Sequence, residues 1–337
     1  MLAAGLGTRL RPLTEATPKP LLPVVGIPIL GHTLAEFARL ADPACEAIAV
    51  NLHYQGEQIR SHFGESFAGI PLTYSEEPVL LGTGGALGPL QEFFASADLI
   101  LLVNGDSLCR WPLQRLLRAH LAGSAAATLL LTRKADPADF GGGVGVDERG
   151  SVLSFRPGDP ESGTVAHRRV FAGAHVLSPA LLSRLRPGPS DIVRDLYSPL
   201  LAEGAPIASL ATSRPWHDLG TPRRFLAATI DWAQGSGGQG RGSWVSPEAV
   251  LETGVKVSRS SIEAHARIEG GARIERSVLL PGAAVGKGSR LSEVILGPGA
   301  EIPPGSSIER RIVTRQLPGS PLNPEDSVVG SMVYTRF

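Results

Sequence analysis

A regular spacing of aliphatic residues in the last third of the chain is the feature that most constrains its fold. A period near six residues fits neither an α-helix nor a hairpin meander, but it is typical of the hexapeptide repeats of a parallel β-helix. We therefore predict about four stacked coils of about 18 residues each over 244–315. The aliphatic positions are Val250, Val255, Val257, Ile262, Ile268, Ile274, Val278, Leu279, Val285, Leu291, Val294, Ile295, Ile302, Ile308, Ile312 and Val313.

The alternative for this region is a disordered tail, because the chain holds 40 glycines and 28 prolines. The regular aliphatic series argues against it, since disordered segments lack such hydrophobic patterning. A Gly/Ser-rich stretch over 234–243 has the composition of a flexible linker, and we place a domain boundary there, after a first domain of residues 1–233. The sequence does not assign the tail 316–337, which either pairs across an interface or packs back on the first domain.

Residues 1–233 alternate short apolar runs with helical patterns. Apolar residues at helical spacing predict helices over 29–40 and 112–122, and strands are predicted over 47–51 and 99–103. Runs that are apolar on both faces indicate a mostly parallel mixed sheet covered by helices on both sides. Further helices are predicted over 55–63, from Ser190 or Asp191 to Leu201, and from Pro222 to Trp232, with strands over 72–74, 126–131, 144–146, 152–155, 170–176 and 207–210.

Composition excludes several classes of protein. A length of 337 residues exceeds what one hydrophobic core usually serves, and 32 basic against 32 acidic residues argue against a broad nucleic-acid-binding or membrane-binding surface. The two cysteines, Cys45 and Cys109, provide neither a disulfide framework nor zinc-site spacing. No apolar run approaches the roughly 18 residues of a membrane span, and Arg9 and Arg11 interrupt any signal-peptide pattern. We expect a cytoplasmic protein with neither a membrane nor a nucleic-acid partner.

The first residues, MLAAGLGTRLRPLTEATPKPLLPV, have the character of a phosphate-binding loop after a strand. Gly5 and Gly7 let the backbone pass near a bulky anion because no Cβ blocks the approach. Successive N–H groups of such a turn attract an anion, and Arg9 adds a planar charged fork that suits phosphate oxygens. The preceding strand has about four residues where about five or six are usual, so either it is clipped or the natural start lies upstream.

Other phosphate-binding patterns do not fit this stretch. A Walker loop closes with Gly-Lys-Ser or Gly-Lys-Thr, and the dinucleotide pattern has a third glycine that opens a helix. Here Pro12, Pro18, Pro20 and Pro23 follow, which makes the connection extended rather than helical. A lone Gly-x-Gly also fits an ordinary strand-to-loop turn, so the interpretation depends on the longer pattern.

Three further charged residues are candidates for a phosphate site. Asp106 follows the apolar run 99–103 within Asn-Gly-Asp, where a carboxylate either holds Mg²⁺ or forms a turn. Asp218, in Trp-His-Asp-Leu-Gly-Thr-Pro, is a candidate ligand or the cap of the helix that follows. Lys19 is flanked by prolines and is either a phosphate-binding cation or a solvated loop lysine. Ligands of such sheets bind at the carboxyl ends of strands, where the phosphate loop and Asp106 converge.

The string G-x-G-T-R-L-x-P-L-T…P-K-P-L-L-P-V resembles the signature of the sugar-1-phosphate nucleotidyltransferases, or NDP-sugar pyrophosphorylases. The resemblance covers almost all of the first domain, extends to the hexapeptide tail and is closest to mannose-1-phosphate guanylyltransferase types. It implies a Rossmann-like, GT-A-like α/β domain followed by a short left-handed parallel β-helix. The Gly-Thr-Gly-Gly form at 82–85 and the segment 191–204 look most like the guanylyl-type members.

The resemblance implies a role for each matched position. Asp106 and Asp218 match the two metal-binding aspartates, so Mg²⁺ is the expected cofactor. Arg9 matches the arginine that contacts the leaving pyrophosphate, and Lys19 matches the lysine that contacts the phosphates at the reacting centre. These four are the expected catalytic residues. The implied nucleotide-binding set is Ala3, Ala4, Gly5, Gly7, Thr8, Arg9, Gly82 and Thr83, with Gly82 letting the backbone approach the base.

The sugar side departs from the family pattern. Many members carry an acidic-basic pair in Glu-Lys-Pro, where this chain has Phe155-Arg156-Pro157. Arg156 can replace the lysine as a phosphate partner, but Phe155 cannot replace the acid, and arginine and lysine are not equivalent at close quarters. The sugar therefore stays open. The expected sugar-phosphate contacts are Lys19, Gly142, Arg156 and Gly173.

The implied activity condenses a nucleoside triphosphate, GTP being favoured, with a sugar 1-phosphate, mannose 1-phosphate being favoured, to an NDP-sugar and pyrophosphate. Uridylyl, thymidylyl or adenylyl transfer to another sugar 1-phosphate is the alternative. A different class is a non-catalytic regulatory homologue that binds a nucleotide sugar. Acyl transfer on the β-helix needs a general-base histidine, and only His265 lies in the repeats. We expect the β-helix to mediate homo-oligomerisation instead.

Overall fold

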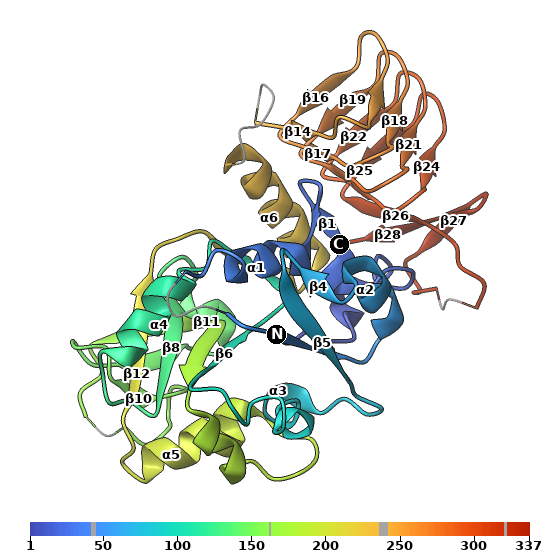
Figure 1. The fold of residues 1–337 in the computed structure, drawn as a ribbon. Helices are drawn as coiled ribbons and strands as arrows, with labels where there is room; N and C mark the ends of the chain where they lie inside the picture. The colour runs from blue at the N-terminus through green and yellow to red at the C-terminus, as the bar shows by residue number, and fades with distance from the viewer. Residues whose placement is uncertain (42–44, 162, 236–241, 320–321) are drawn as a thin grey trace. The chain divides into compact units, whose positions relative to one another are not determined.

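The computed structural model of the chain describes residues 1–337 except 42–44, 162, 236–241 and 320–321 (Figure 1). The described residues form two compact units. The first, here called the sheet unit, comprises Met1–Leu6 and Leu30–Trp216. The second, here called the β-helix unit, comprises Gly7–Ile29 and His217–Phe337. The linker expected over 234–243 falls mainly on 236–241, which lie outside the described residues.

One half of the sheet unit is built from parallel strands. β3 (Ile48–Leu52) pairs in parallel with β5 (Ile70–Glu76), and β4 (Ser66–Phe67) pairs with β5 as a short antiparallel neighbour. Leu2 makes parallel bridges to Asn51 at β3 and to Asn104 after β6 (Ile100–Val103). The chain start therefore lies between β3 and β6, and its strand is a single bridged residue, shorter than the run that the sequence predicts.

The other half of the sheet is mixed. β11 (His167–Leu177) is antiparallel to both β6 and β8 (Ala127–Thr132), and β12 (Ile207–Thr212) is parallel to β8. All six residues of β8 are buried, as expected for a strand that is covered on both faces. β9 (Val144–Val146) and β10 (Val152–Ser154) extend this sheet from β11, while β7 (Ser107–Cys109) and β13 (Trp216–Asp218) lie outside it.

The helices begin close to the positions that the sequence predicts. α4 (Leu113–Leu121) packs on β8, β11 and β12 through a buried leucine face. The segment predicted to begin at Ser190 or Asp191 is a π-helical turn, Val193–Tyr197, followed by α5 (Ser198–Ala202), and Asp191 Oδ1 accepts bonds from the Val193 and Arg194 N–H groups. The others are α1 (Ile29–Phe37), α2 (Gly56–Phe63), α3 (Gly82–Gly85) and α6 (Pro222–Gly235). None of the helices in the described part of the chain is long and apolar enough to cross a membrane.

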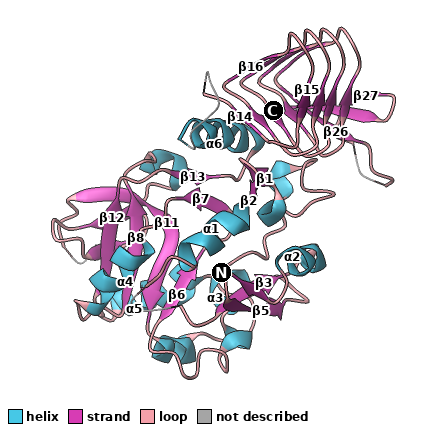
Figure 2. Cartoon of the chain, turned by 45° about the horizontal axis from the view of Figure 1, so that its top comes forward, coloured by secondary structure: helices cyan, strands magenta, loops and turns pink. Residues whose placement is uncertain are grey.

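The repeats form stacked coils of parallel strands, which confirms the predicted fold class (Figure 2). Trp244 pairs with Ser261 and Ser261 with Val278, a step of 17 residues per coil rather than the 18 of three full hexapeptides. One side of each coil is therefore one residue shorter than a full hexapeptide. The chain turns there at Arg259 and at the equivalent residue of each following coil, all of which have positive φ. The strands are β14 (Trp244–Val245), β15 (Val250–Leu251), β16 (Lys256–Ser258), β17 (Ser261–Ile262), β18 (Arg267–Ile268), β19 (Arg273–Glu275), β20 (Val278–Leu279), β21 (Ala284–Val285), β22 (Arg290–Ser292), β23 (Ile295–Leu296), β24 (Glu301–Ile302), β25 (Ser307–Glu309) and β26 (Arg311–Arg315).

The C-terminal tail folds back onto the β-helix. β28 (Met332–Arg336) pairs antiparallel with β26, and β27 (Ser327–Val329) pairs with β28 as the outermost strand. Met332 is 6% exposed and belongs to the same apolar cluster as the aliphatic ladder. The tail therefore continues the sheet of the final coil, a placement that was neither of the two considered from the sequence.

Candidate active site

In the sheet unit, a buried polar network holds the strand that leads into the phosphate loop. The Ala3 N–H donates to Asn51 Oδ1 at 2.7 Å, and Asn51 Nδ2 donates to Glu77 Oε1 at 2.7 Å. Glu77 is 3% exposed, and its Oε2 accepts the Leu81 N–H at 2.8 Å. Gly5 follows in open space, with no atom within 4 Å of the place where a Cβ would be. The network fixes the backbone up to the point where the loop reaches solvent.

Sequence reasoning missed Asn51 and gave Glu77 no role. Asn51 is the fourth residue of β3, and Glu77 directly follows β5, the parallel neighbour of β3. The available signal was a polar residue near the carboxyl end of a strand, because such positions meet at one edge of a parallel sheet.

Asp106 lies beside the same strand end. The Gly105 N–H donates to the Leu2 carbonyl at 2.8 Å, and the Asn104 N–H donates to the Gly173 carbonyl at 2.8 Å. Gly173 has φ +86° within an irregular stretch of β11, and a Cβ there would lie 2.5 Å from Asn104 Nδ2. The structure thus brings together the strand entering the phosphate loop, the Asn104–Asp106 segment and Gly173.

Gly82 and Thr83 contact a second segment of the sheet unit. Gly82 has φ +73°, and a Cβ there would lie 2.7 Å from the Ser190 carbonyl oxygen. The Gly84 and Gly85 N–H groups donate to that same carbonyl. The Thr83 hydroxyl accepts the Ile192 N–H at 2.9 Å. Glycine is therefore required here because a side chain would block the backbone of residues 190–192. This reason is separate from the expected approach of a nucleobase to Gly82.

Gly142 and Arg156 belong to neighbouring loops. Gly142 has φ +86°, and a Cβ there would lie 2.2 Å from Pro157 Cγ. Arg156 is exposed next to that proline, and its backbone N–H donates to Asp159 at 2.8 Å. Only glycine fits at position 142 with this neighbour. The close packing of the loop at Gly142 against the loop at Pro157 therefore requires glycine at this position.

The rest of the phosphate loop lies in the β-helix unit. Gly7 is left-handed with φ 63°, and its carbonyl accepts the Thr14 hydroxyl at 2.9 Å, so the chain turns sharply there. Thr8 and Arg9 are exposed on the short helical turn that follows. Lys19 is 6% exposed, which contradicts its interpretation as a solvated loop lysine.

Asp218 and Arg9 flank Gly220. A Cβ at Gly220 would lie 2.8 Å from Arg9 Nη2 and 3.0 Å from Asp218 Oδ1. The other oxygen of Asp218 accepts a bond from Arg224 Nη1 at 2.5 Å, an ion pair that the sequence reading missed. The Thr221 hydroxyl accepts the Arg224 N–H at 3.3 Å. Thr221 therefore takes the capping role at the start of α6 that was considered for Asp218. One oxygen of Asp218 therefore faces the arginine of the phosphate loop while the other is held by α6.

The expected metal ligands, Asp106 and Asp218, belong to different units, and their common metal site stays a prediction. Within the described ranges, no group of three or more His, Cys, Asp or Glu residues converges as a metal site. Two carboxylates suit Mg²⁺ when phosphate oxygens of the substrates and water complete its shell. The donor chemistry thus fits the expected ion.

Comparison with known proteins identifies the family. Residues 1–235 match the profile of the nucleotidyl transferases, described as "Nucleotidyl transferase". The chain belongs to this family. Residues 226–311 of this nucleotidyl transferase match a second profile, the "GlmU-like, C-terminal hexapeptide" domain. The two matches confirm the resemblance that the sequence motifs indicated.

Several named relatives are similar to this chain. The chain is 32% identical to a mannose-1-phosphate guanylyltransferase of Mycobacterium tuberculosis over 278 residues, which are 77% of this chain and 75% of that protein. It is 30% identical to a mannose-1-phosphate guanylyltransferase catalytic subunit beta of Drosophila pseudoobscura pseudoobscura over 67% of this chain, but it spans only 60% of that relative. Among solved structures, HddC from Yersinia pseudotuberculosis matches with a TM-score of 0.54 and 22% identity, over 68% of this chain and 97% of HddC. That likeness shows the fold alone.

Proposed function

We propose that this nucleotidyl transferase condenses GTP with mannose 1-phosphate to give GDP-mannose and pyrophosphate. The observation that carries the proposal is the placement of Arg9 and Asp218 on either side of Gly220, in a chain whose first 235 residues match the family. The names of the relatives support the substrates. Homo-oligomerisation through the flat faces of the β-helix and a cytoplasmic location, where nucleoside triphosphates are available, are part of the proposal.

In the proposed reaction, an oxygen of the sugar phosphate attacks the α-phosphorus of the triphosphate. The bond from that phosphorus to the β-bridging oxygen breaks, and pyrophosphate leaves with the electron pair. A phosphate dianion is already nucleophilic, so catalysis consists of positioning and charge neutralisation. Arg9 stabilises the leaving pyrophosphate, and Lys19 reduces the repulsion between the two phosphates that must approach.

Mg²⁺ bound by Asp106 and Asp218 would supply a positive charge shared between the phosphate groups. Neighbouring residues position the two aspartates in two ways. Hydrogen bonds of Asn104 and Gly105 fix the backbone before Asp106. Arg224 holds one oxygen of Asp218 and leaves the other directed toward the Arg9 side of Gly220.

The proposed metal role predicts the behaviour of Asp106→Asn. The amide keeps the size of the side chain but removes its charge, so we expect pyrophosphate release to fall about a thousandfold or more. The thermal unfolding midpoint should change little, because Asp106 is half-buried next to solvent. Asp98→Asn, which removes an exposed carboxylate of the same unit, is the control and should retain wild-type turnover.

Wild-type turnover in Asp106→Asn would refute the metal assignment. The nucleobase and the sugar are tested by screening GTP, UTP, dTTP and ATP against mannose, glucose, heptose and amino-sugar 1-phosphates. Faster pyrophosphate release with another pair would replace the proposed substrates. Release with none of them would instead favour a regulatory protein that binds a nucleotide sugar.

A further inference from the structure

The segment 7–29, which carries Arg9 and Lys19, is part of the β-helix unit. Its last residues form a hairpin of β1 (Pro23–Val24) and β2 (Ile27–Pro28). The turn between them consists of Val25 with φ 56° and Gly26 with φ 78°, the left-handed pair typical of a tight two-residue hairpin loop.

A carboxylate of the β-helix binds the backbone of this turn. Glu263 follows β17 and is 1% exposed. Its Oε1 accepts the Val25 N–H at 3.0 Å and its Oε2 accepts the Gly26 N–H at 2.9 Å, so both oxygens are used. The Ser261 hydroxyl donates to Oε1 at 2.9 Å and fixes the carboxylate from its other side.

An aromatic ring of the first coil covers the same turn. A Cβ at Gly26 would lie 2.9 Å from Trp244 Cζ2 and Cη2, so the ring lies directly on the glycine. A side chain at position 26 would displace the indole, and the positive φ would strain it as well. Glu263 and Trp244 thus bind two sides of one hairpin turn.

The hairpin is directly connected to Lys19. The Leu22 N–H donates to the Lys19 carbonyl at 3.1 Å, and the Ile29 N–H donates to the Leu22 carbonyl at 3.1 Å. The chain between Lys19 and the turn is therefore a short hydrogen-bonded connection in which Lys19 is buried. We therefore expect a displacement of the turn to shift Lys19, because hydrogen bonds and only a few residues join them.

We propose that Glu263, assisted by Trp244, is a positioning residue of the transfer reaction: it holds the 23–28 hairpin and thereby places Lys19 for the incoming sugar phosphate. The inference rests on the proposed function of Lys19. It assigns to the β-helix a part in building the active site, beyond the oligomerisation expected from its sequence.

The energetics of burial support a specific role for Glu263. Burial raises the pKa of its carboxyl to about 7, while the bonds from Ser261, Gly26 and Val25 lower it. A buried, charged carboxylate needs hydrogen-bond donors for both oxygens to offset the loss of solvation. Protonation would turn one oxygen into a donor, and that oxygen would lose its bond from the N–H group. The two turn N–H groups provide those donors.

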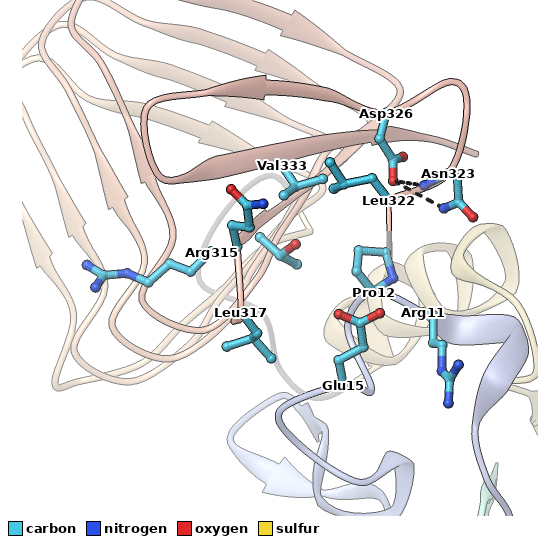
Figure 3. Close-up of a pocket in the computed structure, with 11 residues that line it drawn as sticks. Arg11, Pro12, Glu15, Arg315, Leu317, Leu322, Asn323, Asp326 and Val333 are labelled. Atoms are coloured by element: carbon cyan, nitrogen blue, oxygen red, sulfur yellow. Dashed lines mark hydrogen bonds between the residues drawn. The ribbon is translucent and has the colours of Figure 1, made fainter. Parts of the chain in front are cut away.

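The beginning of the segment also borders the C-terminal part of the unit. Figure 3 shows a small cavity whose wall includes Pro12 and Glu15 on one side and Leu317, Leu322 and Val333 of the tail on the other. Asp326 Oδ2 accepts both the backbone N–H and the side-chain amide of Asn323 there, which fixes the turn at residues 323–326. Residues 244–337 thus border the segment 7–29 near its beginning and bind it at the hairpin near its end.

Hydrogen–deuterium exchange of the full-length protein tests the contact without reference to activity. In Glu263→Gln an NH₂ group replaces one accepting oxygen, so exchange in the peptide 19–29 should accelerate about tenfold. Glu252→Gln is the matched control, because Glu252 also accepts a backbone N–H, that of Gly270 at 2.8 Å, but within the β-helix itself. It should leave exchange in 19–29 unchanged. Trp244→Leu provides a second test if the Glu263 variant fails to fold.

Kinetics of the same variants test the positioning role. We expect kcat/KM for the sugar 1-phosphate to fall about tenfold in Glu263→Gln and to stay unchanged in Glu252→Gln, with the KM for the nucleotide unaffected in both. Unchanged exchange in 19–29 would overturn the inference. Faster exchange with unchanged kcat/KM would also overturn it. A wild-type protein inactive with all substrate pairs would refute the proposed function, and exchange would still decide whether Glu263 holds the hairpin.

Discussion

At the scale of single residues, the site depends on a position that has no side chain. The φ of Gly220 lies outside the left-handed region, so a side chain would not strain the backbone there. What excludes one is space, because Arg9 and Asp218 approach the same point from two sides. The two charged residues could be selected from the sequence by their motifs, but the distance between them could not, since it depends on how residues 9 and 218 meet in the fold.

Replacement of Gly220 by alanine tests this arrangement. The methyl group would lie 2.8 Å from Arg9 Nη2 and 3.0 Å from Asp218 Oδ1, so at least one of them has to move. A shift of this kind at a reacting centre can cost about a hundredfold, and we expect kcat/KM to fall by 10- to 100-fold, roughly. Pyrophosphate release measures the effect. Gly235→Ala, at the end of α6 with no atom within 4 Å of the added Cβ, should be neutral, and equal turnover in the two variants would contradict the role of Gly220.

At the scale of elements, the sequence predicted types and positions well where hydrophobic periodicity is strong. The aliphatic series of residues 250–313 gave the parallel β-helix, but the step is 17 residues rather than 18. The lost residue lies at corners such as Arg259, Arg276 and Arg310, which are left-handed. Arginine has no preference for that conformation, so the shortened corner has no local sequence signal.

The single bridged residue of the first strand has a similar explanation. An apolar start followed by Gly5 indicates a strand, but the length of pairing depends on neighbours. Here Asn51 bonds the Ala3 N–H through its side chain in place of a further backbone ladder bond. Such side-chain substitution for a ladder bond cannot be read from periodicity.

β11 carries a buried histidine that should make stability depend on pH. His175 Nδ1 lies 2.5 Å from the Tyr197 hydroxyl, and burial lowers the pKa of His175 to about 3. Because the folded pKa lies below the unfolded value of 6.5, the unfolded state binds more protons between these values. This contribution to stability is complete above pH 6.5 and is lost as the pH falls toward 3.

Replacing both partners, His175→Leu with Tyr197→Phe, removes the titration and leaves no unpaired polar atom from the pair. Between pH 6 and pH 4, the slope of unfolding free energy against pH should become shallower by up to about 1.4 kcal/mol per pH unit. Urea unfolding at several pH values measures it. His62→Gln, which removes an exposed ring on α2, should leave the slope as in the wild type. An unchanged slope in the double variant would show that His175 does not titrate in this range.

At the scale of the whole molecule, the order of motifs along the chain does not reveal which parts associate. The sequence separates a catalytic domain from a hexapeptide domain at a Gly/Ser-rich stretch. In the structure, residues 7–29 group with residues 217–337. Part of that association comes from Glu263 and Trp244, which lie far along the chain from Val25 and Gly26 and have no motif of their own. Single-sequence reasoning detects local patterns and motif matches, whereas these contacts are long-range and specific to two side chains.

This association predicts that residues 1–235 alone, although they match the whole family profile, are not a competent enzyme. Without the β-helix, the Val25 and Gly26 N–H groups lose the carboxylate of Glu263, and Gly26 loses the ring of Trp244. We expect rapid deuterium exchange over 19–29 in this fragment and a loss of kcat/KM of about a hundredfold or more. Protection of the buried strand β8 in the same experiment serves as the control that the sheet unit has folded. If the fragment instead protected 19–29 and turned over like the full chain, the β-helix would have no part in the active site, because residues 1–235 would then hold the hairpin without it.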